Sequence, residues 1–295
     1  MVLRFGIHLG GTKIEGVVLD AGGRELFRER VATDQSSYDA GLGGIAALHR
    51  RMVGTTGGAP HTRGIGTPGA ISPRTGLLKN APNTACLIGR PFARDLRARL
   101  GRDLAIENDA NCFALAEALH GAGRGKRFVF GVILGTGCGG GIVIDGRVHV
   151  GLQAIGGEWG HMVIDPRGPL CYTGHRGCVE TFISGAGLER RHAEHAGDRL
   201  AAADIVAAWR RGEPHATATM DEFFGHFGQA LANLIGILDP DIVVLGGGLS
   251  NVDELYTRGV DEVAKRVFSD SLETPIVKHA LGDSAGVIGA ALIGI

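Results

Sequence analysis

LRFGIHLGGTKIEGVVL, residues 3–19, is the stretch of sequence that decides the fold. Residues 3–9 and 14–19 are rich in apolar and β-branched side chains, which predicts two strands. Between them stands Gly10-Gly11-Thr12-Lys13, where glycines let backbone N–H groups line a concave anion site next to a hydroxyl and a positive charge. The turn lacks both the spacing of a Walker loop and the helix that follows a dinucleotide fingerprint. It indicates a phosphate-binding turn, with a glycine turn that binds nothing as the alternative.

The same pattern returns near the middle of the chain. A strand is predicted at Phe128–Leu134, followed by the turn Gly135-Thr136-Gly137-Cys138-Gly139-Gly140-Gly141 and a strand at Ile142–Ile144. Two copies about half a chain apart indicate a duplicated phosphate-binding half, and two unrelated hairpins are the alternative. A third run, Gly246-Gly247-Gly248, follows the predicted buried strand Ile242–Leu245. Small residues there make room for a flat ring such as adenine, or form a tight turn for packing alone.

The remaining elements alternate between strand and helix. Further strands are predicted at Glu25–Val31, Thr62–Thr67 and Leu104–Glu107, and helices at Ser37–Val53, Arg94–Leu100, Ala110–Leu119, Leu188–His195, Ala201–Trp209, Thr217–Leu238, Val252–Phe268 and Ala285–Leu292. We therefore expect an α/β protein with two closely packed lobes and a cleft between them. The smaller lobe is predicted to comprise residues 1–109, completed by a C-terminal helix at 284–295, and the larger lobe residues 110–283.

Composition narrows the choice of partners. Thirty Lys and Arg residues face 31 Asp and Glu residues, so the formal net charge of −1 provides no electrostatic footprint for nucleic acid. The sequence shows no signal peptide and no apolar run of membrane-spanning length, so no membrane partner is expected. Five cysteines, an odd number, fit a reducing cytoplasm better than a disulfide scaffold. The 50 glycines follow no Gly-X-Y period, which excludes a collagen-like chain.

The segment Glu107-Asn108-Asp109-Ala110-Asn111 carries the predicted catalytic group. Transfer of a phosphoryl group from ATP needs a positioned nucleophile and charge neutralisation more than covalent chemistry. A carboxylate within hydrogen-bond reach of a sugar hydroxyl can orient it and accept its proton. From these residues alone, Asp109 is either such a base or the N-cap of the following helix.

Six segments, in this order and spacing, resemble the ROK family of bacterial sugar kinases. They are GIHLGGTK (6–13), ENDANCFALAEA (107–118), LGTGCGGG (134–141), GGEWGH (156–161), CYTGHRGCVE (171–180) and DPDIVVLGGGLSN (239–251). The resemblance covers essentially the whole chain and implies an actin/hexokinase-like (ribonuclease H-like) fold. ETFISG (180–185), NVDELY (251–256) and GDSAGVIGAA (282–291) look most like the fructokinase/mannokinase branch, with the N-acetylglucosamine kinase branch a close second.

The resemblance also implies roles for particular residues. The family's catalytic aspartate matches Asp109, and its sugar-contacting positions match Asn108, Glu158, His161 and Glu180, with Gly69 as a backbone approach point. Its ATP-binding positions match Gly10, Gly11, Thr12, Lys13, Gly135, Thr136, Gly137, Gly247 and Gly248, and ATP is expected with Mg²⁺. Taken alone, Glu158 and Glu180 would be solvated surface residues and His161 a structural histidine.

A metal site is implied at 161–180. The family has a distant histidine followed by C-x-C-G-x-x-G-C, a structural zinc site, and structural zinc normally has four ligands. Here His161, Cys171 and Cys178 match, but Thr173 replaces a cysteine. Three alternatives remain: zinc completed by His175, a three-ligand site completed by water, or no zinc. If bound, zinc would hold the loop that carries Glu180.

His8 is a second departure from the family, which has an aspartate there that helps to hold the magnesium of ATP. An imidazole cannot attract a cation as a carboxylate does. We therefore expect a functional but weakened enzyme, or one whose magnesium is held mostly by phosphates and water.

The leading hypothesis is transfer of the ATP γ-phosphate to the 6-hydroxyl of a hexose, fructose first and mannose second. Kinases of N-acetylglucosamine, N-acetylmannosamine or glucose are the alternatives of the same class. Some ROK members are sugar-sensing regulators with an N-terminal DNA-binding segment, but the first strand is predicted to begin at Leu3, which disfavours that function. A binding protein without catalysis is a further alternative. The family resemblance also suggests a homodimer.

Overall fold

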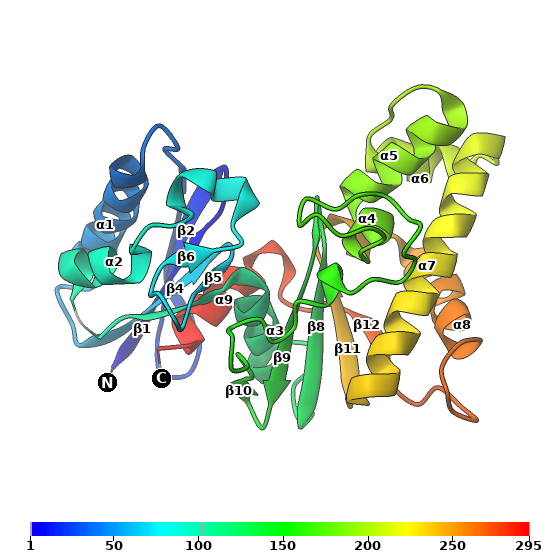
Figure 1. The fold of residues 1–295 in the computed structure, drawn as a ribbon. Coiled ribbons are helices and arrows are strands. Elements are labelled where there is room, and N and C mark those ends of the chain that lie inside the picture. The colour runs from blue at the N-terminus through cyan, green and yellow to red at the C-terminus, as the bar shows by residue number, and fades with distance from the viewer. Residues whose placement is uncertain (1, 102, 295) are drawn as a thin grey trace.

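The structure, a computed structural model, describes residues 2–101 and 103–294. Within these residues, two five-stranded sheets have the strand orders β3-β2-β1-β4-β7 and β10-β9-β8-β11-β12 (Figure 1). In each sheet the first three strands form an antiparallel meander, and the last two strands run parallel to the third. The two halves therefore share one topology, and the repeat predicted from the glycine turns extends over a whole sheet.

The strands have the following bounds. The first sheet contains β1 (Leu3–Leu9), β2 (Lys13–Leu19), β3 (Glu25–Ala32), β4 (His61–Thr67) and β7 (Ala105–Asn108). The second contains β8 (Phe128–Leu134), β9 (Cys138–Ile144), β10 (Arg147–Val148), β11 (Ile242–Gly246) and β12 (Ile276–Lys278). A separate small hairpin pairs β5 (Ala70–Ile71) with β6 (Leu78–Lys79).

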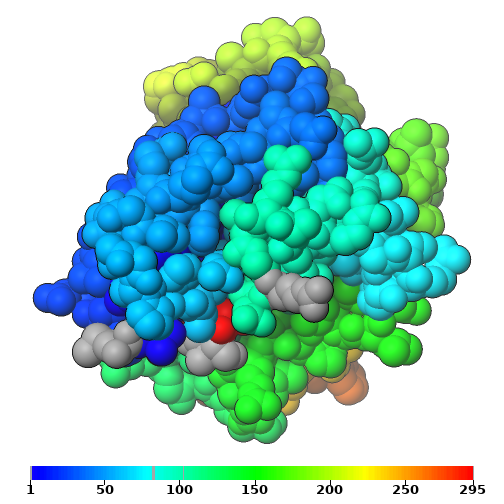
Figure 2. Space-filling view, turned by 90° about the vertical axis from the view of Figure 1, so that its left-hand side faces the viewer, coloured from blue at the N-terminus to red at the C-terminus, as the bar shows by residue number. Residues whose placement is uncertain are grey.

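The α-helices are α1 (Tyr38–Thr55), α2 (Phe92–Leu100), α3 (Asp109–His120), α4 (Glu180–Ile183), α5 (Gly185–Ala196), α6 (Ala202–Arg210), α7 (Pro214–Leu238), α8 (Arg258–Ala264) and α9 (Ala285–Leu292). Short 3₁₀ segments are η1 (Pro82–Leu87), η2 (Trp159–His161), η3 (Gly248–Asn251), η4 (Asp253–Tyr256) and η5 (Gly282–Ser284). Helices α1 and α2 cover the outer side of the first sheet, seen in blue and teal in Figure 2. Helices α5 to α8 gather on the far side of the second sheet, at the opposite end of the molecule (Figure 1).

Helices α3 and α9 form a layer between the two sheets (Figure 1). Glycines allow this layer to pack closely: a Cβ on Gly64 of β4 would lie 1.8 Å from the carbonyl oxygen of Ala290. A Cβ on Gly289 of α9 would lie 1.8 Å from the carbonyl oxygen of Cys112 in α3. Part of the glycine excess therefore serves packing of helices on strands and on each other, rather than phosphate binding.

A buried carboxylate joins α3 to the C-terminal segment. Glu117 is fully buried, and its oxygens accept hydrogen bonds from the backbone N–H groups of Ala122 (2.9 Å), Ala280 (3.0 Å) and Leu281 (2.9 Å). Removing a charge from water is unfavourable unless polar partners replace the water, and these N–H groups do so. Glu117 thus fixes the chain between β12 and α9 against α3.

Most predicted elements lie within a few residues of their observed bounds, but the helix predicted at Val252–Phe268 is wrong. That segment forms η4, then a break at Thr257 with φ −122° and ψ −84°, then the short helix α8. The break lets the Arg258 guanidinium stack 4.6 Å from the centre of the Phe224 ring. Strand β9 also begins at Cys138 rather than Ile142, and the short strands β5, β6, β10 and β12 were not predicted.

Helix α9 makes its packing contacts with β1, β4 and β2 of the first sheet and with α3. Because α9 packs on the first sheet and also on α3, the division into a lobe of residues 1–109 completed by 284–295 and a lobe of residues 110–283 stays a prediction. In the part of the chain that the structure describes, no helix has the length and apolar character needed to span a membrane.

Candidate functional site

A cavity of about 590 Å³ lies where the C-terminal ends of β4 and β7 face the β8–β9 turn. It brings together most of the predicted site residues: Gly69, Asn108, Asp109, Gly135, Thr136, Gly137, Glu158, His161, Cys171 and Glu180. Residues from both sheets contribute, so the cavity is the cleft that the sequence predicts between two α/β lobes.

The junction of β7 and α3 places Asp109. The Asn108 side chain accepts hydrogen bonds from the N–H groups of Ala110 (2.8 Å) and Asn111 (3.3 Å), and is therefore the N-cap of α3. Its amide also donates to the carbonyl oxygen of Gly69, at 3.1 Å. Asp109 is consequently the first helical residue and not the cap, so the capping alternative for Asp109 does not hold.

The surroundings of Asp109 set its proton affinity. Burial raises the pKa of its carboxyl, while the nearby imidazole of His8 opposes that shift. His8 is the last residue but one of β1; its ring packs over Gly66 and Gly286, and burial lowers the pKa of the imidazole. A carboxylate whose pKa is raised toward neutrality is a better proton acceptor than an ordinary aspartate, which is what a general base requires.

Glu180 connects the cavity to the second glycine turn. It begins α4, and its Oε2 accepts a hydrogen bond from the Cys138 N–H at 3.0 Å. A Cβ on Gly137 would lie 2.5 Å from this oxygen, so any larger residue there would make the Glu180 carboxylate move. Glu180 therefore supports the turn, in addition to facing the cavity.

Glu158 is the second acidic group of the cavity wall. It precedes η2 and is half-buried. Burial raises the pKa of its carboxyl; His161 opposes the shift, and the carboxylates of Asp109 and Glu180 add to it. Three carboxyl groups facing one cavity offer several hydrogen-bond acceptors to a polyhydroxylated ligand.

The β8–β9 turn also borders a second cavity, of about 630 Å³. Gly135, Thr136, Gly185, Ala186, Ala202, Ala203, Val206, Gly248, Leu249 and Val252 line it, together with Glu189, Arg210 and Asn251. These small and apolar residues can accommodate a flat ring. Gly247 is not among the lining residues; its φ is +81°, and a Cβ there would lie 2.5 Å from the carbonyl oxygen of Leu134, so it packs against β8. Of the predicted adenine-site glycines, Gly248 lines this cavity, and adenine binding there stays a prediction.

The first glycine turn lies apart from these cavities. Gly10, Gly11, Thr12 and Lys13 are not among the residues that line either one. The turn is closed by a hydrogen bond from the Gly10 N–H to the Lys13 carbonyl (2.9 Å), and Thr33 Oγ1 donates to the Gly10 carbonyl (2.8 Å). Phosphate binding by this turn stays a prediction.

The predicted metal ligands form a cluster of three. The ligand atoms of His161, Cys171 and Cys178 lie within 4.8 Å of one another, and His161 Nδ1 is 3.7 Å from Cys171 Sγ. Tetrahedral zinc with ordinary bond lengths would place a nitrogen and a sulfur about 3.6 Å apart, so the three donors fit zinc. Among the described residues, His175 does not join this cluster; its Nδ1 is 3.3 Å from Thr173 Oγ1. Zinc binding at the three donors stays a prediction.

Two residues that sequence reasoning missed also bear on the cleft. Tyr172 lines the cavity, and its hydroxyl lies 3.2 Å from His161 Nε2. Burial, with the carboxylates Glu180 and Glu158, raises the pKa of the Tyr172 phenol to about 12. Lys79 of β6 donates to the Gln153 carbonyl at 2.7 Å and so links the two sides of the cleft. An exposed tyrosine between two cysteines and a lone lysine follow no pattern that sequence analysis could detect.

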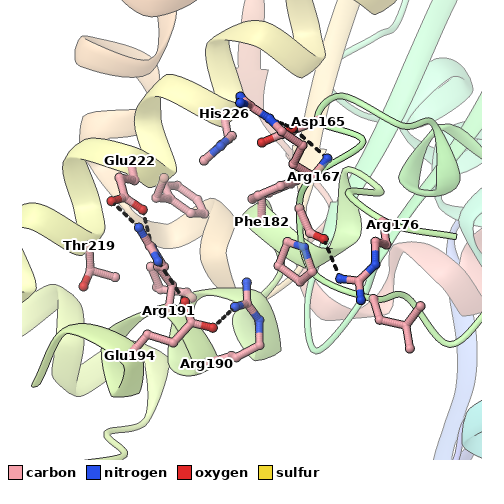
Figure 3. A pocket seen from close by; sticks show the side chains of 15 residues that line it. Asp165, Arg167, Arg176, Phe182, Arg190, Arg191, Glu194, Thr219, Glu222 and His226 are labelled. Carbon is pink, nitrogen blue, oxygen red and sulfur yellow. Dashed lines mark hydrogen bonds and ion pairs between the residues drawn. The ribbon is translucent and has the colours of Figure 1, made fainter. Parts of the chain in front are cut away.

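A third cavity, of about 610 Å³, lies behind α4 (Figure 3). Phe182 stacks on His226 there, with ring centres 4.1 Å apart, and Arg191 pairs with Glu222. Arg190 lines both this cavity and the cleft, and donates to the Thr181 carbonyl at 3.0 Å. The single turn of α4 is thus a wall with Glu180 on the cleft side and Phe182 on the other.

Comparison with known proteins identifies the relatives of this chain. The profile of the ROK family matches residues 4–294. The N-acetyl-D-glucosamine kinase of Photobacterium profundum is 38% identical over 301 residues, which cover 99% of each chain. The structure of a ROK hexokinase from Thermus thermophilus has a TM-score of 0.91 at 34% identity, covering 99% of this chain and 97% of that one. A ROK family glucokinase from Streptomyces griseus, in complex with glucose and AMPPNP, has a TM-score of 0.81 at 30% identity, covering 99% and 98%. The predicted actin/hexokinase-like fold is confirmed.

Proposed function

We propose, from the premise that the chain belongs to the ROK family of sugar kinases, that it transfers the γ-phosphate of ATP to the 6-hydroxyl of N-acetylglucosamine. Fructose, which the sequence motifs favoured, is not supported as the acceptor. The relative that is 38% identical is named an N-acetylglucosamine kinase, which supports the alternative named in the sequence analysis. Glucose is the second candidate, because a related glucokinase structure at 30% identity contains glucose.

The observation that carries this proposal is the position of Asp109. Its carboxylate stands at the N-terminus of α3, in the same cavity as Glu158, Glu180 and the β8–β9 glycine turn. The sugar 6-hydroxyl would donate its proton to Asp109 as its oxygen bonds to the γ-phosphorus, and the bond from that phosphorus to the bridging oxygen of ADP would break. Asp109 thereby receives the proton that the 6-hydroxyl loses.

The nucleotide would enter as its magnesium complex, with the adenine in the cavity beside Gly248 and the phosphates near the β8–β9 turn. Backbone N–H groups of a glycine turn suit phosphate oxygens because no side chain blocks their approach. Asn108, Glu158, His161 and Glu180, with the backbone at Gly69, would then surround the sugar. A homodimer and a cytoplasmic location stay predictions.

The test is a panel of acceptors with the purified protein. Production of ADP would be measured with N-acetylglucosamine, glucose, N-acetylmannosamine, mannose and fructose, and the phosphorylated carbon identified by NMR. We expect the highest kcat/KM with N-acetylglucosamine and phosphate on carbon 6. Asp109→Asn should lower kcat by about 10²- to 10⁴-fold, the usual contribution of a general base, while the protein still binds ATP. An unchanged kcat in this variant would refute the proposed role of Asp109.

A further inference from the structure

The loop between the two cysteines of the metal cluster places an aromatic hydroxyl in the sugar cavity. We propose that Tyr172 is a sugar-binding residue, and that its hydroxyl contacts the acceptor in the place that family resemblance gives to His161. This inference rests on the proposed function, because it assumes that the cleft holds a sugar.

The first support is the way in which His161 is held. Its Nδ1 faces Cys171 Sγ at 3.7 Å, and its Nε2 faces the Tyr172 hydroxyl at 3.2 Å. The two rings meet edge to face, with centres 5.3 Å apart and planes at 86°. Both ring nitrogens of His161 therefore have partners from one loop, and Tyr172 stands at the nitrogen that would otherwise point to a ligand.

The second support is the hydrogen-bonding capacity of the phenol. A tyrosine hydroxyl offers one donor and can also accept, so its bond to His161 Nε2 leaves capacity for a second partner. If Nε2 accepts from the phenol, the phenol oxygen can accept from a sugar hydroxyl; if Nε2 donates, the phenol can donate to the sugar. In either tautomer of His161, Tyr172 presents a polar atom to a substrate.

The third support is that the Tyr172 side chain is exposed to the cavity that contains Asp109. Tyr172 lines the same cavity as Asp109, Glu158 and Glu180 and is 58% exposed, whereas the flanking Cys171 is buried. An apolar ring edge with a polar tip suits a sugar, which has both C–H faces and hydroxyl groups. Residues that contact the acceptor and not the nucleotide determine which sugar is preferred, so Tyr172 is placed to determine specificity.

The experiment compares Tyr172→Phe with the wild type. We expect the KM for N-acetylglucosamine to rise about fivefold, the effect of losing one hydrogen bond of about 1 kcal/mol, with kcat and the KM for ATP within twofold of wild type. Tyr38→Phe is the matched control: it removes a hydroxyl that bonds to Asp95 at 2.8 Å in the first lobe, and should leave both KM values unchanged. Metal content would be measured in all three proteins, so that a change in the cluster is recognised.

A series of deoxy sugars then tests for direct contact. For one deoxy sugar, wild type and Tyr172→Phe should have the same KM. The hydroxyl missing from that sugar is the one that contacts Tyr172, as in a double-mutant cycle. An unchanged or lowered KM for the sugar in Tyr172→Phe would overturn the inference, and so would an equal effect on every analogue. A wild-type protein that phosphorylates no sugar would instead refute the proposed function, which keeps the two failures apart.

Discussion

Asp109 shows how a single residue acquires a role from the residues beside it. Asn108 caps α3 and binds the Gly69 carbonyl, which leaves the next carboxylate at the first helical position, where the positive end of the helix dipole favours an anion. Burial acts in the opposite direction and raises the pKa of Asp109. The balance between these effects decides how much of the base is ionised at a given pH.

The pH dependence of catalysis should report the pKa of Asp109. Only the ionised carboxylate can accept the sugar proton, so kcat/KM should fall as the pH drops through the pKa of Asp109. Because burial raises this pKa, the acid limb should lie above the ordinary value of about 4, with a slope approaching tenfold per pH unit. A profile of kcat/KM against pH measures it. An acid limb below pH 4 would contradict the raised pKa.

His8→Asp should raise turnover at alkaline pH. The substitution restores the carboxylate that the resemblance places next to the magnesium of ATP, and carboxylates are preferred magnesium ligands. It also sets a second negative charge near Asp109, which should move the acid limb to higher pH. Turnover at several magnesium concentrations would be compared with His8→Asn, which has no charge and should show no gain. A lower turnover in His8→Asp would show that the histidine is adapted to its place.

At the level of elements, the sequence predicts a strand or helix correctly where the residues of that element alone determine its conformation. The strands on either side of both glycine turns were predicted because apolar runs end at glycines. The helix predicted at Val252–Phe268 fails because its apolar spacing continues across Thr257, where the backbone leaves the helical conformation and Arg258 stacks on Phe224. The three-residue strand β12 is too short for any periodicity, and pairing with β11 defines it.

Glu117→Gln should destabilise the junction of α3 with the C-terminal segment. The amide has one acceptor oxygen instead of two, and its NH₂ group would face the N–H donors of Ala280 and Leu281. We expect the free energy of unfolding to fall by about 2–4 kcal/mol, because buried donors lose a charged acceptor. Urea unfolding measures this free energy. As a control, Glu273→Gln at an exposed position should change the free energy of unfolding by less than about 0.5 kcal/mol. Equal stability of both variants would contradict this role.

Over the whole molecule, the site combines segments from distant parts of the chain. Asn108 ends β7 and Asp109 begins α3, the glycine turn joins β8 to β9, and Glu180 follows the cluster of His161, Cys171 and Cys178. Family resemblance could place these residues because each lies in a recognisable motif. It could not place Tyr172 or the alanines of α6 that line the cavity beside Gly248, because ordinary residue types at unremarkable spacings become a site only when the fold assembles them.

Metal removal should affect stability and sugar binding together. If zinc joins His161, Cys171 and Cys178, it fixes the loop that carries Tyr172 and ends next to Glu180. Treatment with a chelator should therefore lower the melting temperature and raise the KM for the sugar, while the KM for ATP changes less. Elemental analysis before and after treatment shows whether zinc was present. A zinc-free protein with unchanged melting and an unchanged KM would rule out the structural role.

The position of α9 has a consequence for synthesis on the ribosome. The N-terminal sheet emerges early, yet the atoms nearest to Gly6 and Gly64 among the described residues belong to Val287, Ala290, Ala291 and Ile293, which are translated long after that sheet. Until α9 has been made, the face of the sheet around Gly6 and Gly64 stays uncovered, so the first lobe can close only after α9 has left the ribosome. A stop codon ahead of Ala285 would therefore damage the half of the protein that was made first.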